Sequence, residues 1–172
     1  PGQTTISFTN TVEIEGLVDL YFGDDLILGG IDYGEISVPT PILSGTYDVS
    51  IFPEDADPND TEPIAGTQFI ANPDEDIVLV LIGDPDSIEF AIYRNDVEPT
   101  YDNQARITFL HALETVPTIL LTSTNSDLDS RLSYGRFSNT FDLDTDSIVS
   151  FTWIQQLDDV QDIALETFSD FA

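Results

Sequence analysis

The sequence predicts an all-β protein composed of tandem immunoglobulin-like β-sandwich domains. Three observations indicate this fold class: short apolar runs that alternate with polar residues, turn-forming residues between the runs, and a pattern that recurs along the chain. Many short strands separated by turns are typical of a β-sandwich. Hydrophobic residues make up 41% of the 172 residues, which is enough for one large core or two small ones.

The apolar runs have the period of two that places alternate side chains on opposite faces of a strand. Clear examples lie at residues 6–8, 18–22, 47–51 and 88–92. Residues 77–82 are apolar throughout, as expected for a strand that is covered on both faces. Turn residues separate the runs at Gly23-Asp24-Asp25, Gly29-Gly30, Ser44-Gly45, Asn72-Pro73-Asp74 and Asp84-Pro85-Asp86.

Part of the pattern recurs at a constant offset of 101 residues, the separation between Tyr33-Gly34 and Tyr134-Gly135. Further related pairs are Ile6 and Ile107, Phe8 and Phe109, Val18 and Ile119, Leu20 and Leu121, Ser37 and Ser138, and, after one inserted residue, Ile51 and Trp153. An offset kept over about thirty residues predicts two related domains. We expect both Tyr-Gly pairs to occupy equivalent places, with each tyrosine at least half buried and each glycine at a bulge or a positive φ.

The second of these domains is predicted to lack two strands. The first copy continues through apolar runs at 64–70, 77–82 and 88–93, whereas the second has only 163–168. The position in the repeat favours a strand there. A helix is the alternative, because helical spacing also fits Leu157, Val160, Ala164, Phe168 and Phe171. The predicted boundaries are 1–97 for the first sandwich, 98–104 for a linker and 105–172 for the second, shorter sandwich.

The charge excludes two classes of partner. The chain has 33 acidic residues, four arginines and no lysine, and its formal net charge is -29. Such a surface repels nucleic acid and anionic membranes, so we expect neither nucleic-acid binding nor membrane insertion. It attracts cations, and it suits a salty, halophilic exterior as well as an ordinary secreted setting. The lack of cysteine excludes disulfides, thiolate metal sites and a cysteine nucleophile.

Residues 18–52 resemble a known family. Their segments VDLYFGDDLIL, DYGEIS and LSGTYDVSIF are similar to the secreted prokaryotic β-sandwich repeats described as domain of unknown function 4397. That family's pattern runs from an apolar strand ending in His-Ala-Ser-Pro through Val-Asp-Val-Tyr and Tyr-Gly to Ala-Gly-x-Tyr-x-Val. His111-Ala112 matches the opening in the second copy only, and Val18-Asp19-Leu20-Tyr21 matches the next element in the first copy only. The resemblance implies a secreted or cell-surface sandwich in a prokaryote and brings no catalytic residue.

Two groups of alternating acidic residues are candidate calcium ligands, and calcium is the one candidate cofactor, although none is required. The groups are Asp55, Asp57 and Asn59, and Asp142, Asp144 and Asp146. Hard oxygens at such spacing resemble the start of a calcium loop, but Asp60 stands where that loop needs glycine and Gly66 where it needs glutamate. An ordinary solvated loop is the alternative. Asn59-Asp60-Thr61 is a glycosylation sequon, so Asn59 is also a candidate glycosylation site.

No motif specifies a reaction, and no catalytic residue is predicted. His111 is the only histidine, and no serine stands in a recognisable nucleophile elbow, so we expect His111 to be a polar residue at the end of a strand. Trp153 aligns with Ile51, which predicts a place in the core instead of on a sugar-binding platform. No carboxylate pair stands out for glycoside hydrolysis.

The predicted function is that of a non-enzymatic extracellular structural protein, which assembles with copies of itself into a cell-surface filament, sheath or lattice through β-strand contacts. Missing strands leave an unpaired edge that is a template for another chain. Residues 1–9 are the candidate donor, and their competing use is as the first strand of their own domain. Closure by residues 155–172 and lost sequence are the alternatives for the gap. The predicted assembly residues are Pro1, Thr5, Ile163, Phe168 and Phe171. The alternative function is a monomeric adhesion or ligand-binding module, for instance one that binds surface glycans.

Overall fold

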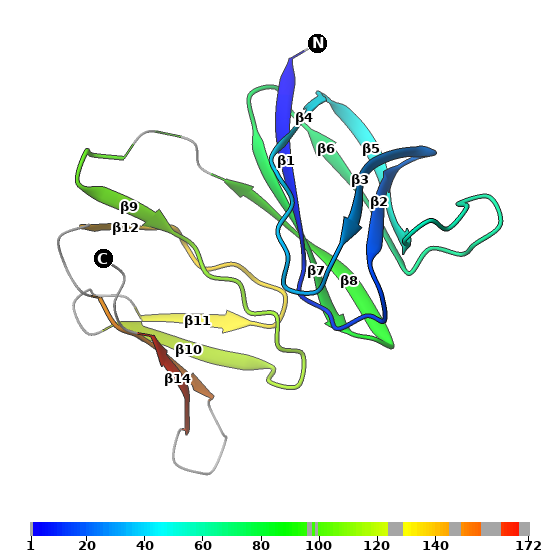
Figure 1. The fold of residues 1–172 in the computed structure, drawn as a ribbon. Helices are drawn as coiled ribbons and strands as arrows, with labels where there is room; N and C mark the ends of the chain where they lie inside the picture. The colour runs from blue at the N-terminus through cyan, green and yellow to red at the C-terminus, as the bar shows by residue number, and fades with distance from the viewer. Residues whose placement is uncertain are drawn as a thin grey trace. The chain divides into compact units, whose positions relative to one another are not determined.

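The computed structural model describes residues 2–95, 98, 100–123, 129–144, 149–155 and 163–168. The chain divides into two compact units, Pro1–Val97 and Glu98–Ala172, which are described separately (Figure 1). Every regular element in the described residues is a β-strand, so the predicted all-β fold is confirmed. No helix in this part of the chain has the length and apolarity needed to cross a membrane.

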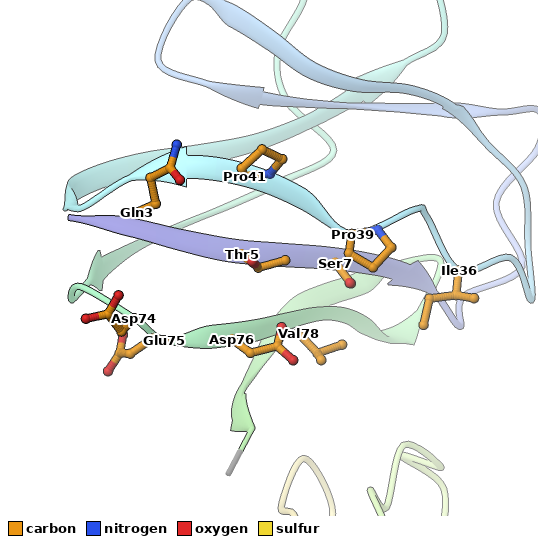
Figure 2. Close-up of a pocket in the computed structure, with 10 residues that line it drawn as sticks. All are labelled: Gln3, Thr5, Ser7, Ile36, Pro39, Pro41, Asp74, Glu75, Asp76 and Val78. Carbon is orange, nitrogen blue, oxygen red and sulfur yellow. The ribbon is translucent and has the colours of Figure 1, made fainter. Parts of the chain in front are cut away.

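Eight strands form two four-stranded sheets in the first unit, with the orders β4-β1-β7-β8 and β3-β2-β5-β6. The strands are β1 (Gln3–Asn10), β2 (Val18–Phe22), β3 (Asp25–Ile31), β4 (Thr40–Leu43), β5 (Gly45–Pro53), β6 (Ala65–Ala71), β7 (Asp76–Asp84) and β8 (Ser87–Asn95). β1 is central, because it pairs antiparallel with β4 and parallel with β7. Thr5 and Ser7 lie on its outer face (Figure 2).

The two sheets of the first unit form a sandwich around one core. Ile6 and Phe8 from one sheet, and Leu20 and Ile51 from the other, are fully buried. Burying one such side chain contributes about 1.5–3 kcal/mol. Residues 79–82 of β7 are all buried, in agreement with the predicted strand that is covered on both faces.

The second unit has a four-stranded sheet of order β11-β10-β13-β14 and a separate pair, β12-β9. Its strands are β9 (Gln104–Ile107), β10 (Thr118–Ser123), β11 (Asp129–Ser133), β12 (Phe141–Asp144), β13 (Phe151–Gln155) and β14 (Ile163–Phe168). Residues 163–168 are thus a strand, as favoured above, and not part of a helix. The predicted linker ends one residue too late, because Gln104 already pairs with Asp144 in β9.

The two Tyr-Gly pairs lie in equivalent hydrogen-bonded turns, one in each unit. The Gly34 N–H donates to the Asn10 carbonyl at 2.8 Å, and the Gly135 N–H donates to the His111 carbonyl at 2.8 Å. Gly34 has φ 75° and Gly135 has φ 71°, the left-handed conformation that glycine adopts without steric cost. The predicted positive φ at both glycines is confirmed. The immunoglobulin-like and tandem parts of the fold prediction stay predictions.

A serine completes this turn in each unit. The Ser37 hydroxyl accepts a hydrogen bond from the Phe8 N–H at 2.9 Å, and the Ser138 hydroxyl accepts one from the Phe109 N–H at the same distance. Both serines are 8% exposed. The repeated serine therefore fixes the returning chain against the first strand of each unit.

The expected burial of both tyrosines is wrong for Tyr33, which is 56% exposed. The turn there is held by its own polar groups: the Tyr33 N–H donates to the Asp32 carboxylate and the Asp32 N–H to the Glu35 carboxylate. No ring is needed to hold it. Tyr134 is less exposed, and its ring packs edge-on against the His111 ring, with 6.4 Å between centroids.

Replacing Gly34 with alanine is expected to lower the free energy of unfolding of the first unit by about 1 kcal/mol, through backbone strain alone. A Cβ at this position would meet no atom within 4 Å, so packing contributes nothing. Gly34→Asn is the matched control, since asparagine tolerates this conformation better and should cost less. Hydrogen exchange of first-unit amides measures both. Equal losses for the two variants would contradict the explanation by strain.

Candidate functional site

The clearest functional feature is one edge of β9. In the first unit Ile6 pairs with Thr40 on β4 and also with Ile77 on β7. The corresponding pair in the second unit, Ile107 with Phe141, joins β9 to β12. On the side where β1 meets β7, the described residues contain no strand beside β9. We refer to this side as the open edge of β9.

The apolar side chains next to the open edge are less buried than their first-unit counterparts. Ile107 and Phe109 are only partly buried, whereas their first-unit counterparts Ile6 and Phe8 are completely buried. The Phe109 ring retains contacts with Phe151, at 4.8 Å between centroids, and with a tryptophan on β13. Among its described residues the second unit therefore keeps its apolar strands but shows no strand that covers this side of them.

The Trp153 side chain packs in the second core, next to Phe109 and Phe151. It contacts both buried clusters of this unit, one of which contains Leu121. This position agrees with the predicted core role. Since it is the only tryptophan of the chain, its fluorescence reports on the second unit.

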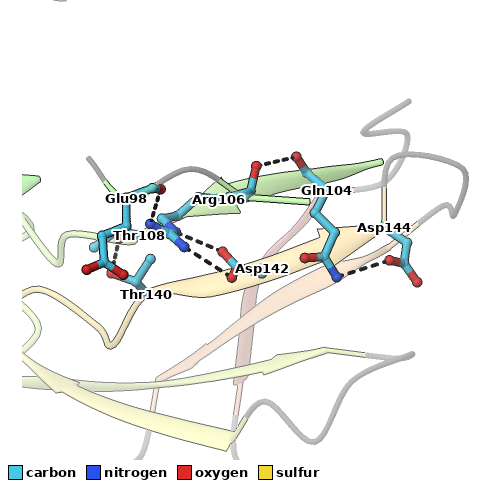
Figure 3. A network of polar contacts seen from close by, with 8 residues as sticks. Glu98, Gln104, Arg106, Thr108, Thr140, Asp142 and Asp144 are labelled. Carbon is cyan, nitrogen blue, oxygen red and sulfur yellow. Dashed lines mark hydrogen bonds and ion pairs between the residues drawn. The ribbon is translucent and has the colours of Figure 1, made fainter. Parts of the chain in front are cut away.

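A polar network covers the outer face of the β9-β12 pair (Figure 3). The Arg106 guanidinium binds both oxygens of Asp142, at 2.8 and 3.2 Å. The Gln104 amide donates to Asp144 at 3.3 Å. Hydrogen bonding from Arg106 lowers the pKa of Asp142. The two aspartates share one face, as predicted, but a guanidinium and an amide occupy their oxygens. The third candidate ligand, Asp146, lies outside the described residues, and calcium at this place stays a prediction.

The other candidate calcium loop is held by internal hydrogen bonds. The Asp57 carboxylate accepts from the Asn59 N–H at 2.9 Å and from the Asn59 side-chain amide at 3.0 Å, and these bonds lower the pKa of Asp57. No group of three acidic or histidine side chains in the described residues has the geometry of a metal site. Asn59 is exposed. Calcium binding and glycosylation here stay predictions.

Asp19 is a polar site that the sequence analysis missed. It is the second residue of β2 and is only 4% exposed. Its two carboxylate oxygens accept the Gly30 N–H at 2.8 Å and the Asp55 N–H at 3.1 Å. Both donors have positive φ, of 70° and 61°; Gly30 lies near the end of β3 and Asp55 in the turn after β5. The carboxylate therefore ties β3 and this turn to β2. An acidic residue between apolar neighbours in a strand was the signal for it.

His111 also has a structural role. It is 3% exposed, its Nε2 lies 2.7 Å from the Val116 carbonyl, and its Nδ1 accepts from the Leu113 N–H at 3.4 Å. The second contact requires an unprotonated Nδ1, so the ring is neutral with the proton on Nε2. Asn10 holds the corresponding place in the first unit and accepts from the Val12 N–H in the same way. The predicted structural role agrees with these contacts, but β9 already ends at Ile107, so His111 follows the strand by four residues.

The predicted assembly residues lie in different places. Thr5 is paired on both sides within its own unit, and Gln3–Asn10 form the first strand of that unit, so the prediction that this segment is donated is wrong. Ile163 and Phe168 belong to β14, which pairs with β13. Residues 163–168 thus lie beside β13. Pro1 and Phe171 lie outside the described residues.

Comparison with protein-family models gives a match. Residues 4–122 match a family model described as "Domain of unknown function (DUF4397)". The matched range begins in β1 and ends in β10. No curated protein matches the chain.

Asp19→Ala is expected to lower the free energy of unfolding of the first unit by about 2 kcal/mol or more, because two N–H groups lose their acceptor in a buried place. The matched control is Asp48→Ala, which removes an exposed carboxylate bound to one glutamine amide and should change stability by less than about 0.5 kcal/mol. Urea unfolding followed by far-ultraviolet circular dichroism measures both. A loss of stability from Asp19→Ala as small as that from Asp48→Ala would show that Asp19 does not hold β3 and the turn at Asp55 against β2.

Burial lowers the pKa of His111 below its ordinary 6.5, against the opposing effect of the bond to Val116. The unfolded chain therefore takes up the proton more readily. The second unit should be most stable above about pH 6.5 and lose stability as the pH falls from there to the lowered pKa of the folded state. His111→Asn, which introduces the first-unit residue, should remove this part of the pH dependence. Unfolding followed by Trp153 fluorescence between about pH 8 and pH 5 compares the two. Identical pH profiles would contradict the prediction.

Proposed function

This chain belongs to the family described as domain of unknown function (DUF4397), and we propose that it is a non-enzymatic extracellular structural protein that assembles with copies of itself at the prokaryotic cell surface. The observation that carries the proposal is the open edge of β9. An unpaired strand edge next to a partly covered core is a template for a strand from another chain. The assembly that results is a filament, sheath or lattice joined by β-strand contacts.

The first unit offers a candidate strand for this edge. Its sheets end in four edge strands, and three of them contain proline or glycine, which weaken strand pairing: β4 contains Pro41, β3 contains Gly29-Gly30 with an irregular register, and β6 contains Gly66. β8 has nine residues without proline or glycine. Pairing of β8 in one copy with β9 in the next would continue the sheet that contains β1 into the sheet that contains β9.

This contact joins two different surfaces, one from each unit. A contact between unlike surfaces that does not close on itself produces an open chain of subunits. The net charge of -29 opposes association, and salt reduces this repulsion because it screens exposed charges. A salty surface environment is therefore part of the proposal.

The alternative is a monomeric adhesion or ligand-binding module at the cell surface. It needs no strand exchange and predicts a stable monomer at high concentration. The open edge is the observation that favours assembly over this alternative, since a self-sufficient module gains nothing from it.

Filling the open edge within one chain should abolish assembly. In the test, a second copy of residues 72–95 is added after Ala172, so that the β7-β8 hairpin follows β14 as it follows β6 in the first unit. Light scattering in about 1 M NaCl, where charge repulsion is screened, should show concentration-dependent association of the unmodified chain. The extended chain should stay monomeric and unfold at a higher temperature by Trp153 fluorescence.

The matched control carries the same added residues in scrambled order and should associate like the unmodified chain. If the unmodified chain is a stable monomer at high concentration in this salt, the assembly proposal is wrong and the binding-module alternative replaces it. If the ordered extension associates as fully as the scrambled one, the contact between copies does not use β9.

A further inference from the structure

A groove of about 510 Å³ lies on the outer face of the first unit, over β4, β1 and β7 (Figure 2). Its floor is a row of three polar side chains on β1, Gln3, Thr5 and Ser7. Pro39 and Pro41 form one wall. The groove belongs to the first unit alone and is independent of the assembly proposed above.

The floor of the groove has unused hydrogen-bonding capacity. Ser7 is 8% exposed, and its hydroxyl has no hydrogen-bond partner among the described residues. In Figure 2 the Ser7 hydroxyl points away from β1 into the groove. A bound ligand can therefore offer this hydroxyl a hydrogen-bond partner.

In the second unit the equivalent three side chains have hydrogen-bond partners. At the offset of 101 residues the row becomes Gln104, Arg106 and Thr108, and these side chains bond across to Asp144, Asp142 and Thr140 on the facing chain (Figure 3). In the first unit the facing positions are Leu43, Pro41 and Pro39. Their side chains offer neither donor nor acceptor. The outer face that is satisfied internally in one unit is therefore open in the other.

The remaining side of the groove is acidic. Asp74, Glu75 and Asp76 line it at the start of β7. Glu75 is engaged by the Arg94 guanidinium, and one oxygen of Asp76 accepts from the Asn95 amide at 3.1 Å. Asp74 is exposed and has no side-chain hydrogen bond among the described residues. This rim keeps a negative charge that a cationic group can neutralise.

We propose that the groove binds an extended segment of a partner protein that carries an arginine side chain. The guanidinium lies at the acidic rim, where charge-assisted bonds to carboxylates are strong. The aliphatic stem of the arginine packs against Pro39 and Pro41. The hydroxyls of Thr5 and Ser7 bond to the polar groups of the bound segment. In the second unit Arg106 already holds a guanidinium over the corresponding position of β9, bound to a carboxylate.

The test uses the peptide acetyl-Ala-Arg-Ala-amide and its citrulline analogue, which has the same shape without the charge. Backbone amide shifts of the full chain are followed by nuclear magnetic resonance at about 0.15 M salt, where distant charges are screened. We expect the arginine peptide to shift amides of β1 and of the start of β7, and the citrulline peptide to bind at least roughly tenfold more weakly, the equivalent of one lost charge-assisted bond.

A matched pair of variants separates this site from general attraction to an acidic surface. Asp74 and Asp55 are both exposed aspartates with positive φ, 63° and 61°, and asparagine keeps that conformation. Asp74→Asn should weaken binding several-fold, and Asp55→Asn, with the same change in net charge, should leave it unchanged. Ser7→Ala should also weaken binding.

Three results would overturn the proposal. Equal effects of Asp74→Asn and Asp55→Asn, or shifts scattered over both units, would show attraction to net charge only. If the citrulline peptide binds as tightly as the arginine peptide, the groove does not recognise a cationic group. Shifts of the groove amides by a neutral sugar such as glucose, with none from the arginine peptide, would assign the groove to carbohydrate.

Discussion

The pairing of β1 with both β4 and β7 is the constraint on which the first unit depends. It brings together strands about seventy residues apart in the sequence and completes the sheet over the core. Ile6, Phe8, Ile77 and Leu79 are all fully buried as a result. In the described residues the second unit repeats the pairing on one side only, and its equivalent residues Ile107 and Phe109 are only partly buried. The first strands of the two units otherwise share the same register and equivalent turns.

The outer faces of β1 and β9, the first strands of the two units, carry different side chains at equivalent backbone positions. In the second unit, Arg106 and Asp142 neutralise each other across β9 and β12. In the first unit, Thr5 and Pro41 take these places, and Ser7 faces Pro39, which offers it no hydrogen-bond partner. Different side chains at equivalent positions thus distinguish a surface whose polar groups bond to one another from a surface with a groove. The backbone pairing of these strands is the same in both cases.

The buried polar residues were only partly predictable. The structural role of His111 followed from the alternation of the preceding residues, and the structure adds why it is buried: both ring nitrogens bond to backbone groups of the next turn. Asp19 was visible as part of a motif, but its role depends on Gly30 and Asp55, which approach it only when β3 and the turn after β5 fold back beside β2. The alternating aspartates at 142 and 144 do share a face. Their partners come from another strand, which spacing along one strand does not identify.

The sequence by itself determined the all-β class, the positions of most strands, the related turns around Gly34 and Gly135, and the family. These are local properties: a period of two, turn residues and a constant offset can all be read within short windows. The tertiary structure alone decided that β1 is a central strand and not a donor, that Tyr33 faces solvent, and which edge of β9 has no strand beside it in the described residues. Alternation specifies which side chains share a face of a strand but not which strand lies beside it, because strand neighbours are chosen by contacts between distant parts of the chain.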